Sequence, residues 1–337
     1  MSRVVVTGGA GYIGSHAVKA LLESGRDVVV YDDLSAGHRE AVDRLARQWP
    51  SRVSLVEGDV RDTDRVTSVL SGSGAGAVMH FAAWLSVPES VVDPAGYYSN
   101  NVGGALSVVE AMVRARVAHF VFSSTCAVFG EPDEMPIPET HATRPVNAYG
   151  ETKLAVERAL PHYERAYGLR FVALRYFNAA GADPGGWLGE DHHPEIHLIP
   201  RAIEAVRGGE RLKVFGTDYP TPDGTCLRDY IHVADLADAH VKALAALEGG
   251  AASAVFNLGN GEPHSVLQVV KAVERATGRA VPFDLAPRRA GDPAALYASN
   301  GRIREALSWH PRFASLETIV ESAWQWHSQH PRGYKSE

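Results

Sequence analysis

A tyrosine and a lysine, Tyr149 and Lys153, stand four residues apart in a segment with helical periodicity. Side chains at i and i+4 share one face of a helix, so the phenol and the ammonium can act together. A tyrosine of ordinary pKa ~10 is a weak base, but a nearby lysine and a cationic nicotinamide ring both favour the phenolate. Tyr149 would take a proton from a substrate hydroxyl, and Thr125 would hydrogen-bond and align that hydroxyl. On its own such a pair is more often a surface feature, so its meaning depends on the neighbouring motifs.

A glycine-rich segment follows the first apolar run. Residues 4–7 lead into Gly8, Gly11 and Gly14, with a helical pattern beginning at Tyr12. Glycine permits a tight turn and lets a pyrophosphate approach the backbone, and the N-terminus of the helix then faces the phosphates. This spacing, directly after a strand, predicts a dinucleotide site.

Carboxylates follow the next two apolar runs. Asp32 and Asp33 end the second run, near the offset of ~20 residues at which an acidic side chain meets the adenosine ribose hydroxyls. A carboxylate accepts hydrogen bonds from a diol and repels a 2′-phosphate, so we expect NAD and not NADP. Asp59, after the third run, is either an adenine contact or a turn residue.

Short β-branched runs alternate with longer helical patterns along the first half of the chain. This alternation, with runs apolar on both faces, is typical of a parallel sheet covered by helices on both sides. We therefore expect a doubly wound α/β (Rossmann) domain over residues 1–177, with returning segments near 228–247, and a smaller mixed α/β lobe over 178–337. The predicted strands are 4–7, 28–31, 54–57, 77–81, 120–123 and 171–174, and the predicted helices are 12–24, 62–70, 94–114, 147–167, 198–207, 233–247, 265–277 and 315–326.

Composition excludes several classes of protein. The 337 residues are 45% hydrophobic and 22% charged, as in an ordinary globular chain, and the net charge of −7 offers no basic surface for nucleic acid. The two cysteines, Cys126 and Cys226, cannot form a disulfide framework or a CxxC metal site. The first residues lack the apolar stretch of a signal peptide, and no run approaches the ~18 apolar residues of a membrane span. We expect a cytoplasmic protein with no nucleic-acid or membrane partner.

Thr125, Tyr149 and Lys153 together resemble the catalytic residues of the extended short-chain dehydrogenase/reductase superfamily. Further motifs are similar to those of its UDP-glucose 4-epimerase family: residues 80–83, 88–90, 97–102, 175–178, 189–191, 215–219, 228–233 and 286–292. The resemblance implies interconversion of UDP-galactose and UDP-glucose with tightly bound NAD. The sugar C4 is oxidised, the 4-keto sugar turns about its phosphate linkage, and hydride returns to the opposite face.

The resemblance also implies particular contacts. The cofactor would be held by Gly8, Gly11, Tyr12, Ile13, Gly14, Asp32, Asp33, Asp59, Val60, Phe81, Ala82, Ala83, Asn100, Ser123, Tyr149, Lys153 and Tyr176. The UDP-sugar would be held by Thr125, Phe177, Asn178, His197, Leu198, Phe215, Arg228, Tyr230, Arg289 and Asp292. Arginines can fork onto diphosphate oxygens, and Phe215 can pack on uracil. Relatives suggest a homodimer formed through helices of the first domain.

Some departures from the family leave alternatives open. Leu85 replaces a lysine that some members place near the cofactor. Leu296 is intermediate between a tyrosine that restricts the sugar pocket and smaller residues that admit N-acetyl sugars, so UDP-N-acetylglucosamine or a UDP-pentose remains a possible substrate. A nucleotide-sugar 4,6-dehydratase is less favoured because Cys126 and Ala127 stand where dehydratases carry Asp and Glu.

Two further features bear on other classes of protein. An NAD-binding regulator without activity would be expected to lack Tyr149 or Lys153, and both are present. Residues 191–197 are rich in histidine and carboxylates, but their spacing matches no familiar zinc motif, so we expect no metal and assign this segment to a loop over the substrate.

Overall fold

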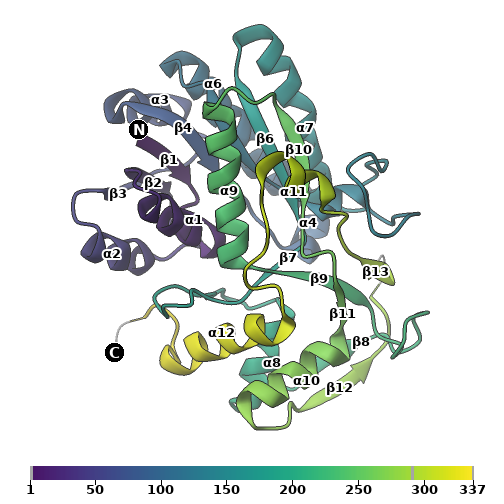
Figure 1. The fold of residues 1–337 in the computed structure, drawn as a ribbon. Coiled ribbons are helices and arrows are strands. Elements are labelled where there is room, and N and C mark those ends of the chain that lie inside the picture. Colours follow the sequence, from purple (N-terminus) through teal and green to yellow (C-terminus); the bar gives the residue numbers. More distant parts are fainter. Residues whose placement is uncertain (1–2, 290–291, 336–337) are drawn as a thin grey trace.

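Seven parallel strands form the central sheet of the computed structural model, which describes residues 3–289 and 292–335 (Figure 1). Their spatial order is β10-β6-β5-β4-β1-β2-β3. The strands are β1 Arg3–Thr7, β2 Val28–Asp32, β3 Val53–Glu57, β4 Ala75–His80, β5 His119–Thr125, β6 Arg170–Tyr176 and β10 Ala254–Leu258. The predicted doubly wound fold is confirmed, and the six predicted strands all lie in this sheet.

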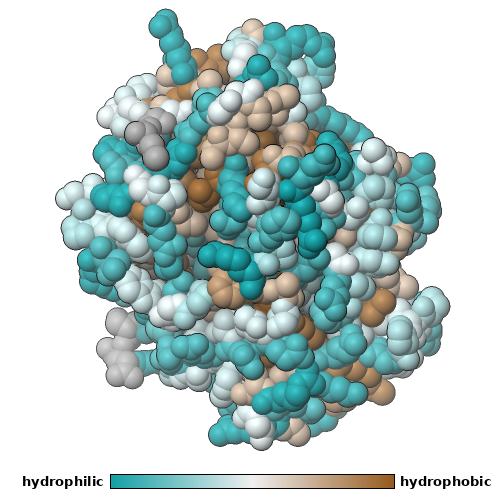
Figure 2. Space-filling model, in the orientation of Figure 1, coloured by the Kyte–Doolittle hydropathy of each residue, from teal (hydrophilic) through white to brown (hydrophobic). Residues whose placement is uncertain are grey.

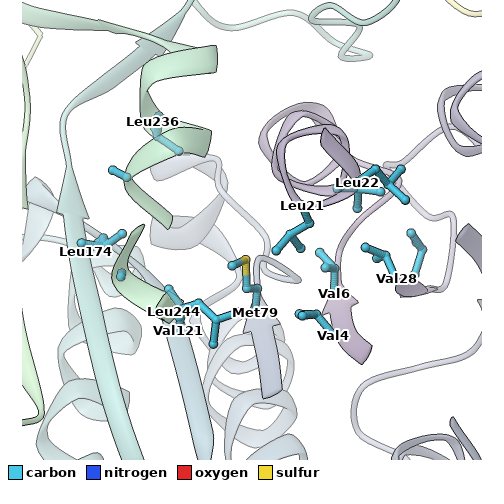
Figure 3. Close-up of a cluster of buried hydrophobic side chains, with 14 of the residues drawn as sticks. Val4, Val6, Leu21, Leu22, Val28, Met79, Val121, Leu174, Leu236 and Leu244 are labelled. Atoms are coloured by element: carbon cyan, nitrogen blue, oxygen red, sulfur yellow. The ribbon is translucent and has the colours of Figure 1, made fainter. Parts of the chain in front are cut away.

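Helices cover both faces of the sheet. They are α1 Tyr12–Glu23, α2 Arg39–Gln48, α3 Thr63–Ser73, α4 Val87–Val92, α5 Pro94–Tyr97, α6 Gly104–Ala115, α7 Ala148–Tyr167, α9 Val233–Glu248 and α11 Gly301–Leu307. Alternate residues of a strand point to opposite faces. Val4 and Val6 accordingly pack with α1, α2 and α9, whereas Val5 packs with α3, α6 and α7. Figure 3 shows the first of these cores, where Leu21 and Leu244 of the covering helices meet the strand side chains.

Residues 178–335 also form a smaller lobe, which lies below the sheet in Figure 1. Its strands are β7 Asn178–Ala180, β8 Leu212–Phe215, β9 Leu227–His232, β11 Pro263–Ser265, β12 Phe283–Ala286 and β13 Ala295–Leu296, and its helices are α8 Leu198–Val206, α10 Val266–Thr277 and α12 Leu316–Gln329. Strand β9 pairs with β7, β11 and β13, and β12 pairs with β8. The lobe has a hydrophobic core of its own, in which α8, α10 and α12 meet.

The structure departs from the sequence prediction in several elements. The sequence pattern does not predict the helices α2, α4 and α11 or the edge strand β10. The helix expected over 94–114 is instead α5, a π-helix η1 over Tyr98–Gly103, and α6. Widening of the helix at η1 carries Asn100 and Asn101 inward, where both are buried, and π-helical turns of this kind often occur at functional sites.

The visible surface is mostly hydrophilic, with apolar residues in scattered small areas (Figure 2). Within residues 3–289 and 292–335 we find no helix with the length and apolar character needed to cross a membrane.

Candidate active site

One cavity lies at the carboxyl ends of the central strands and takes in most of the predicted site. Every residue predicted to hold the cofactor lines it except Asp59, whose carboxylate instead pairs with the guanidinium of Arg61. Thr125, Phe177, Asn178 and His197 of the predicted substrate set line it as well. The carboxyl ends of strands are where open α/β sheets bind ligands.

Close backbone contacts explain the glycines of the first loop. Gly8 has a φ of +70°, and a Cβ there would come within 2.4 Å of the backbone nitrogen of Ala82. A Cβ on Gly14 would come within 2.0 Å of the Gly8 carbonyl oxygen. The loop can therefore pack closely on itself and against Ala82, and it leads directly into the N-terminus of α1, which begins at Tyr12 and can face an anion.

Asp32 ends β2 beside this loop. Its carboxylate accepts hydrogen bonds from the backbone N–H groups of Ala10 and Leu34, both at 2.9 Å. Burial raises the pKa of Asp32 above its ordinary value, while these two N–H groups oppose the rise. Each carboxylate oxygen retains a lone pair for a further donor such as a ribose hydroxyl.

Thr125, Tyr149 and Lys153 meet at the floor of the cavity. Thr125 ends β5, and Tyr149 lies in the first turn of α7, where the Asn147 side chain caps the helix by accepting from Gly150 N at 2.8 Å. Lys153 lies one turn further along and donates from Nζ to the Ser123 carbonyl oxygen at 2.8 Å. The strand end and the helix start thus hold the three side chains together.

Burial disfavours charge on both titratable groups. It raises the pKa of Tyr149 well above 10, although the neighbouring Thr125 hydroxyl opposes the rise, and it lowers the pKa of Lys153 to about 7. A phenolate at Tyr149 therefore needs positive charge brought into the cavity. A bound nicotinamide cation would supply it, because an opposite charge nearby favours the ionised form.

A buried ion pair supports this arrangement from behind and was not predicted. Glu157, one turn after Lys153 on α7, accepts from Arg175 Nη2 of β6 at 2.6 Å and from Ser124 Oγ of β5 at 2.5 Å. Both side chains of the pair are more than nine-tenths buried. These contacts join α7, which carries Tyr149 and Lys153, to β6 through Arg175 and to β5, which carries Thr125, through Ser124. Pairing across such distances in the chain leaves no local sequence signal.

The remaining predicted substrate residues do not line the cavity. Among the described residues this holds for Leu198, Phe215, Arg228, Tyr230, Arg289 and Asp292. Arg228 pairs with the Asp292 carboxylate and donates to the carbonyl oxygens of Leu227 and Pro293. The Arg289 guanidinium lies 4.0 Å from the centroid of the Phe215 ring. Residues 290 and 291 of the predicted 286–292 motif lie outside the described residues.

Other lining residues are not predicted by the sequence, among them Ser35, Gly37, Gly58, Trp84 and Cys126. Leu85 and His192 also line the cavity, in keeping with the expected place of Leu85 near the cofactor and of residues 191–197 over the substrate. At Gly58, in the turn after β3, the glycine itself is the feature that could have indicated the site. A Cβ there would come within 2.3 Å of the Tyr31 hydroxyl. Trp84 is placed by Asn101, whose Oδ1 accepts from Trp84 N at 2.8 Å, and this contact depends on the π-helix.

A glycine-rich loop at a helix start, an acidic residue ending the second strand and a Thr-Tyr-Lys set over the sheet define a dinucleotide-dependent enzyme of the short-chain dehydrogenase/reductase class. The profile of the NAD dependent epimerase/dehydratase family matches residues 4–259, and the chain belongs to this family. The resemblance inferred from the sequence motifs is confirmed.

Relatives of known activity match the whole chain. A UDP-glucose 4-epimerase of Lacticaseibacillus casei is 48% identical over 332 residues, covering 98% of each chain. The crystal structure of a UDP-glucose 4-epimerase from Brucella ovis in complex with NAD is 49% identical with a TM-score of 0.92, covering 96% of this chain and 98% of that one. The enzyme from Bifidobacterium longum in complex with NAD+ and UDP is 37% identical with a TM-score of 0.93, covering 98% and 100%.

Proposed function

We propose that this chain is an NAD-dependent UDP-glucose 4-epimerase that interconverts UDP-galactose and UDP-glucose. The observation that carries the proposal is one cavity that joins the glycine-rich loop to Thr125, Tyr149 and Lys153. Full-length similarity to enzymes of this activity supports the choice of reaction within the family.

The residues of the cavity fit NAD. Gly8 and Gly14 let the loop fold tightly where a Cβ would collide with backbone atoms, the start of α1 offers free N–H groups, and the Asp32 carboxylate can accept from the adenosine ribose. Lys153 would donate from Nζ to the nicotinamide ribose, and Asn100, Phe81 and Tyr176 also line the cavity. Bound NAD+ would supply the acceptor for a hydride from the sugar C4 and the donor for its return to the opposite face.

Tyr149 acts as the base and then as the acid. Its oxygen takes the proton of the C4 hydroxyl as the sugar is oxidised and gives the proton back when the C4 alcohol re-forms. Thr125 hydrogen-bonds the reacting oxygen and fixes its direction. Burial keeps Tyr149 protonated without a cationic ligand, so proton removal is coupled to cofactor binding.

The diphosphate and uridine lie toward the smaller lobe in this proposal. Asn178 and His197 line the cavity beside the reactive groups and can donate to phosphate oxygens. Arg228 and Arg289 lie further out with Phe215, Tyr230, Leu198 and Asp292, so they would reach UDP by exchanging their present partners for it. The UDP held by the B. longum relative supports a uridine diphosphate ligand.

We also propose a cytoplasmic homodimer. Large apolar side chains are exposed on adjoining elements of the first domain: Val91 and Val92 on α4 are 65% and 81% exposed, and Tyr167 ends α7 at 60%. Helix α4 packs against α7, so Val91 and Val92 lie beside a helix of the first domain, and Tyr167 lies at the C-terminal end of that 20-residue helix. Light scattering during size-exclusion chromatography should give twice the mass of 36.3 kDa. A monomer would contradict the proposed dimer but not the proposed epimerase activity.

The function is tested by incubating the purified protein with UDP-galactose and no added NAD, and separating the products by chromatography. We expect a mixture of UDP-galactose and UDP-glucose, because the cofactor stays bound through purification. A 4-keto-6-deoxy product would contradict the epimerase and indicate a dehydratase. Failure to convert UDP-galactose even with added NAD, alongside conversion of UDP-N-acetylglucosamine, would move the activity to another UDP-sugar.

A further inference from the structure

Four side chains of the segment between β7 and α8 converge on one point. They are Glu190, His192, Glu195 and His197, and one donor atom from each lies within 4.8 Å of all the others. His192 Nδ1 lies 3.2 Å from Glu190 Oε1 and 3.8 Å from Glu195 Oε2, and His197 Nδ1 lies 2.5 Å from Glu190 Oε1 and 3.4 Å from Glu195 Oε1.

Two carboxylates with little exposure face two imidazoles here: the Glu190 and Glu195 side chains are 4% and 5% exposed, and those of His192 and His197 are 16% and 40% exposed. Among the described residues, Glu190 Oε1 has no hydrogen-bond partner. The Nδ1 atoms of His192 and His197 likewise lack a well-aligned hydrogen bond, although they lie close to carboxylate oxygens. Two carboxylates held together with so little exposure favour a positive charge at the point that all four groups face.

We propose that this point holds a divalent metal ion, of which Zn²⁺ suits the ligands best. Two imidazoles and two carboxylates form a set that zinc accepts in tetrahedral geometry. Bonds of ~2.0–2.1 Å place the ligand atoms of such a site ~3.3 Å apart. Two of the distances above, at 3.2 and 3.4 Å, lie near this value; the distance of 3.8 Å, to the other oxygen of Glu195, is longer, and the pair at 2.5 Å must open as the ion enters.

Hydrogen bonds from backbone N–H groups hold the segment in this conformation. Glu195 Oε1 accepts from the N–H groups of Ile196 and His197 at 2.7 and 2.8 Å, which orients its carboxylate toward the other three groups. Next to Glu190, Gly189 N donates to the Tyr334 hydroxyl at 3.0 Å, which ties that end of the segment to the C-terminal part of the chain. The spacing in sequence had argued against a metal, but the segment folds back on itself and brings the ligands together.

Four protein ligands make this a closed, structural site and not a catalytic one. The ion would join the segment to the start of α8, since His197 directly precedes Leu198. His192 and His197 also line the active-site cavity. Because His197 would bind the ion through Nδ1, its Nε2–H remains to donate toward a ligand in the cavity, and the ion fixes that tautomer.

The test is the metal content of the full-length protein, purified without chelators or metal-loaded resin and measured by inductively coupled plasma mass spectrometry. We expect one zinc ion per chain, and a tetrahedral Co²⁺ absorption spectrum after removal of zinc and addition of Co²⁺. Glu190→Gln should lose the zinc and the spectrum. His193→Gln is the matched control, because His193 lies in the same segment, is 63% exposed and is outside the set of four.

If Glu190→Gln fails to fold by circular dichroism, His192→Gln serves for the same comparison. The proposal is overturned if chelator-treated wild-type protein binds neither Zn²⁺ nor Co²⁺ at one equivalent, or if it binds them no better than the variant. The four groups would then form ion pairs only. None of these measurements uses a UDP-sugar, so the outcome is separate from that of the epimerase assay.

Discussion

The two sides of the active-site cavity are built in different ways. The cofactor side consists of backbone turns and short side chains at the ends of parallel strands, and nearly every residue predicted for it lines the cavity. The substrate side draws on the smaller lobe, where Arg228 and Asp292 are paired with each other and Arg289 is stacked on Phe215. We infer that the cofactor side is formed before ligand binds, whereas the substrate side exchanges its internal contacts for those to UDP.

The largest effect should come from Tyr149→Phe, which removes the proposed base from the junction of the two sides. The phenyl ring keeps the packing of the buried side chain, so the variant should fold and retain NAD while turnover falls by ~10²–10⁴-fold. Single-turnover rates and the NAD content of the purified protein measure the two effects. Tyr163→Phe, on the same helix, is the control and should leave both unchanged, whereas wild-type turnover in Tyr149→Phe would remove the phenol from the mechanism.

The rigidity of the cofactor side depends on the buried pair of Glu157 and Arg175. Glu157→Gln leaves the Arg175 guanidinium buried without a counter-charge, so the free energy of unfolding should fall by about 3–5 kcal/mol. Urea denaturation measures the loss. Glu151→Gln, on the first turn of the same helix, should cause little change. Equal stability of the two variants would show that the pair does not hold α7 on the sheet.

The substrate side is tested with Arg228→Gln. Losing a charged donor to the diphosphate should raise the KM for UDP-galactose by ~10–100-fold while the bound NAD stays constant. Arg288→Gln is the matched control, since Arg288 is an arginine of the same lobe that stacks on Tyr219 and pairs with Asp218. Loss of bound NAD in Arg228→Gln would mean that cofactor binding depends on a residue of the substrate side, and it would contradict the comparison.

A smaller effect is expected on the pH dependence of stability, through Asp229 of the smaller lobe. Burial raises the pKa of Asp229 to about 6 from 3.8, against the opposing backbone N–H groups of Ala298, Gly261 and Asn260. Between these two values the folded chain binds more protons at Asp229 than the unfolded chain does. The contribution of Asp229 to stability therefore decreases as pH rises from about 4 to 6 and is constant above that range.

This dependence is measured by urea denaturation of wild type and Asp229→Asn across the same range. The free energy of unfolding of the wild type, relative to that of Asp229→Asn, should decrease as pH increases. A difference that does not change with pH would show that Asp229 titrates normally in the folded protein.

Local patterns made the cofactor side predictable from the sequence. The glycines, Asp32 and the strand ends each carry their signal within a few residues, because one βα turn builds the phosphate site. The Tyr149 and Lys153 pair is also local, since both stand on one helix face.

Contacts between distant segments could not be predicted in the same way. Glu157 finds Arg175 only after α7 has packed on the sheet, and Asn101 finds Trp84 only through the π-helix. The present partners of Arg228 and Arg289 follow from how the smaller lobe packs, which no spacing of residues reveals. Glu190 and His197 lie close together in the chain, but their convergence depends on how that segment folds back on itself, which the residue spacing does not show.

The central claim, that hydride leaves C4 and returns to it within one closed site, is tested most directly with UDP-galactose deuterated at C4. The product UDP-glucose should keep the deuterium at C4, as seen by mass spectrometry and proton NMR, with none lost to water. Replacement of the deuterium by solvent hydrogen at C4 would contradict hydride transfer to a retained cofactor and with it the account given for Tyr149, Lys153 and the glycine-rich loop.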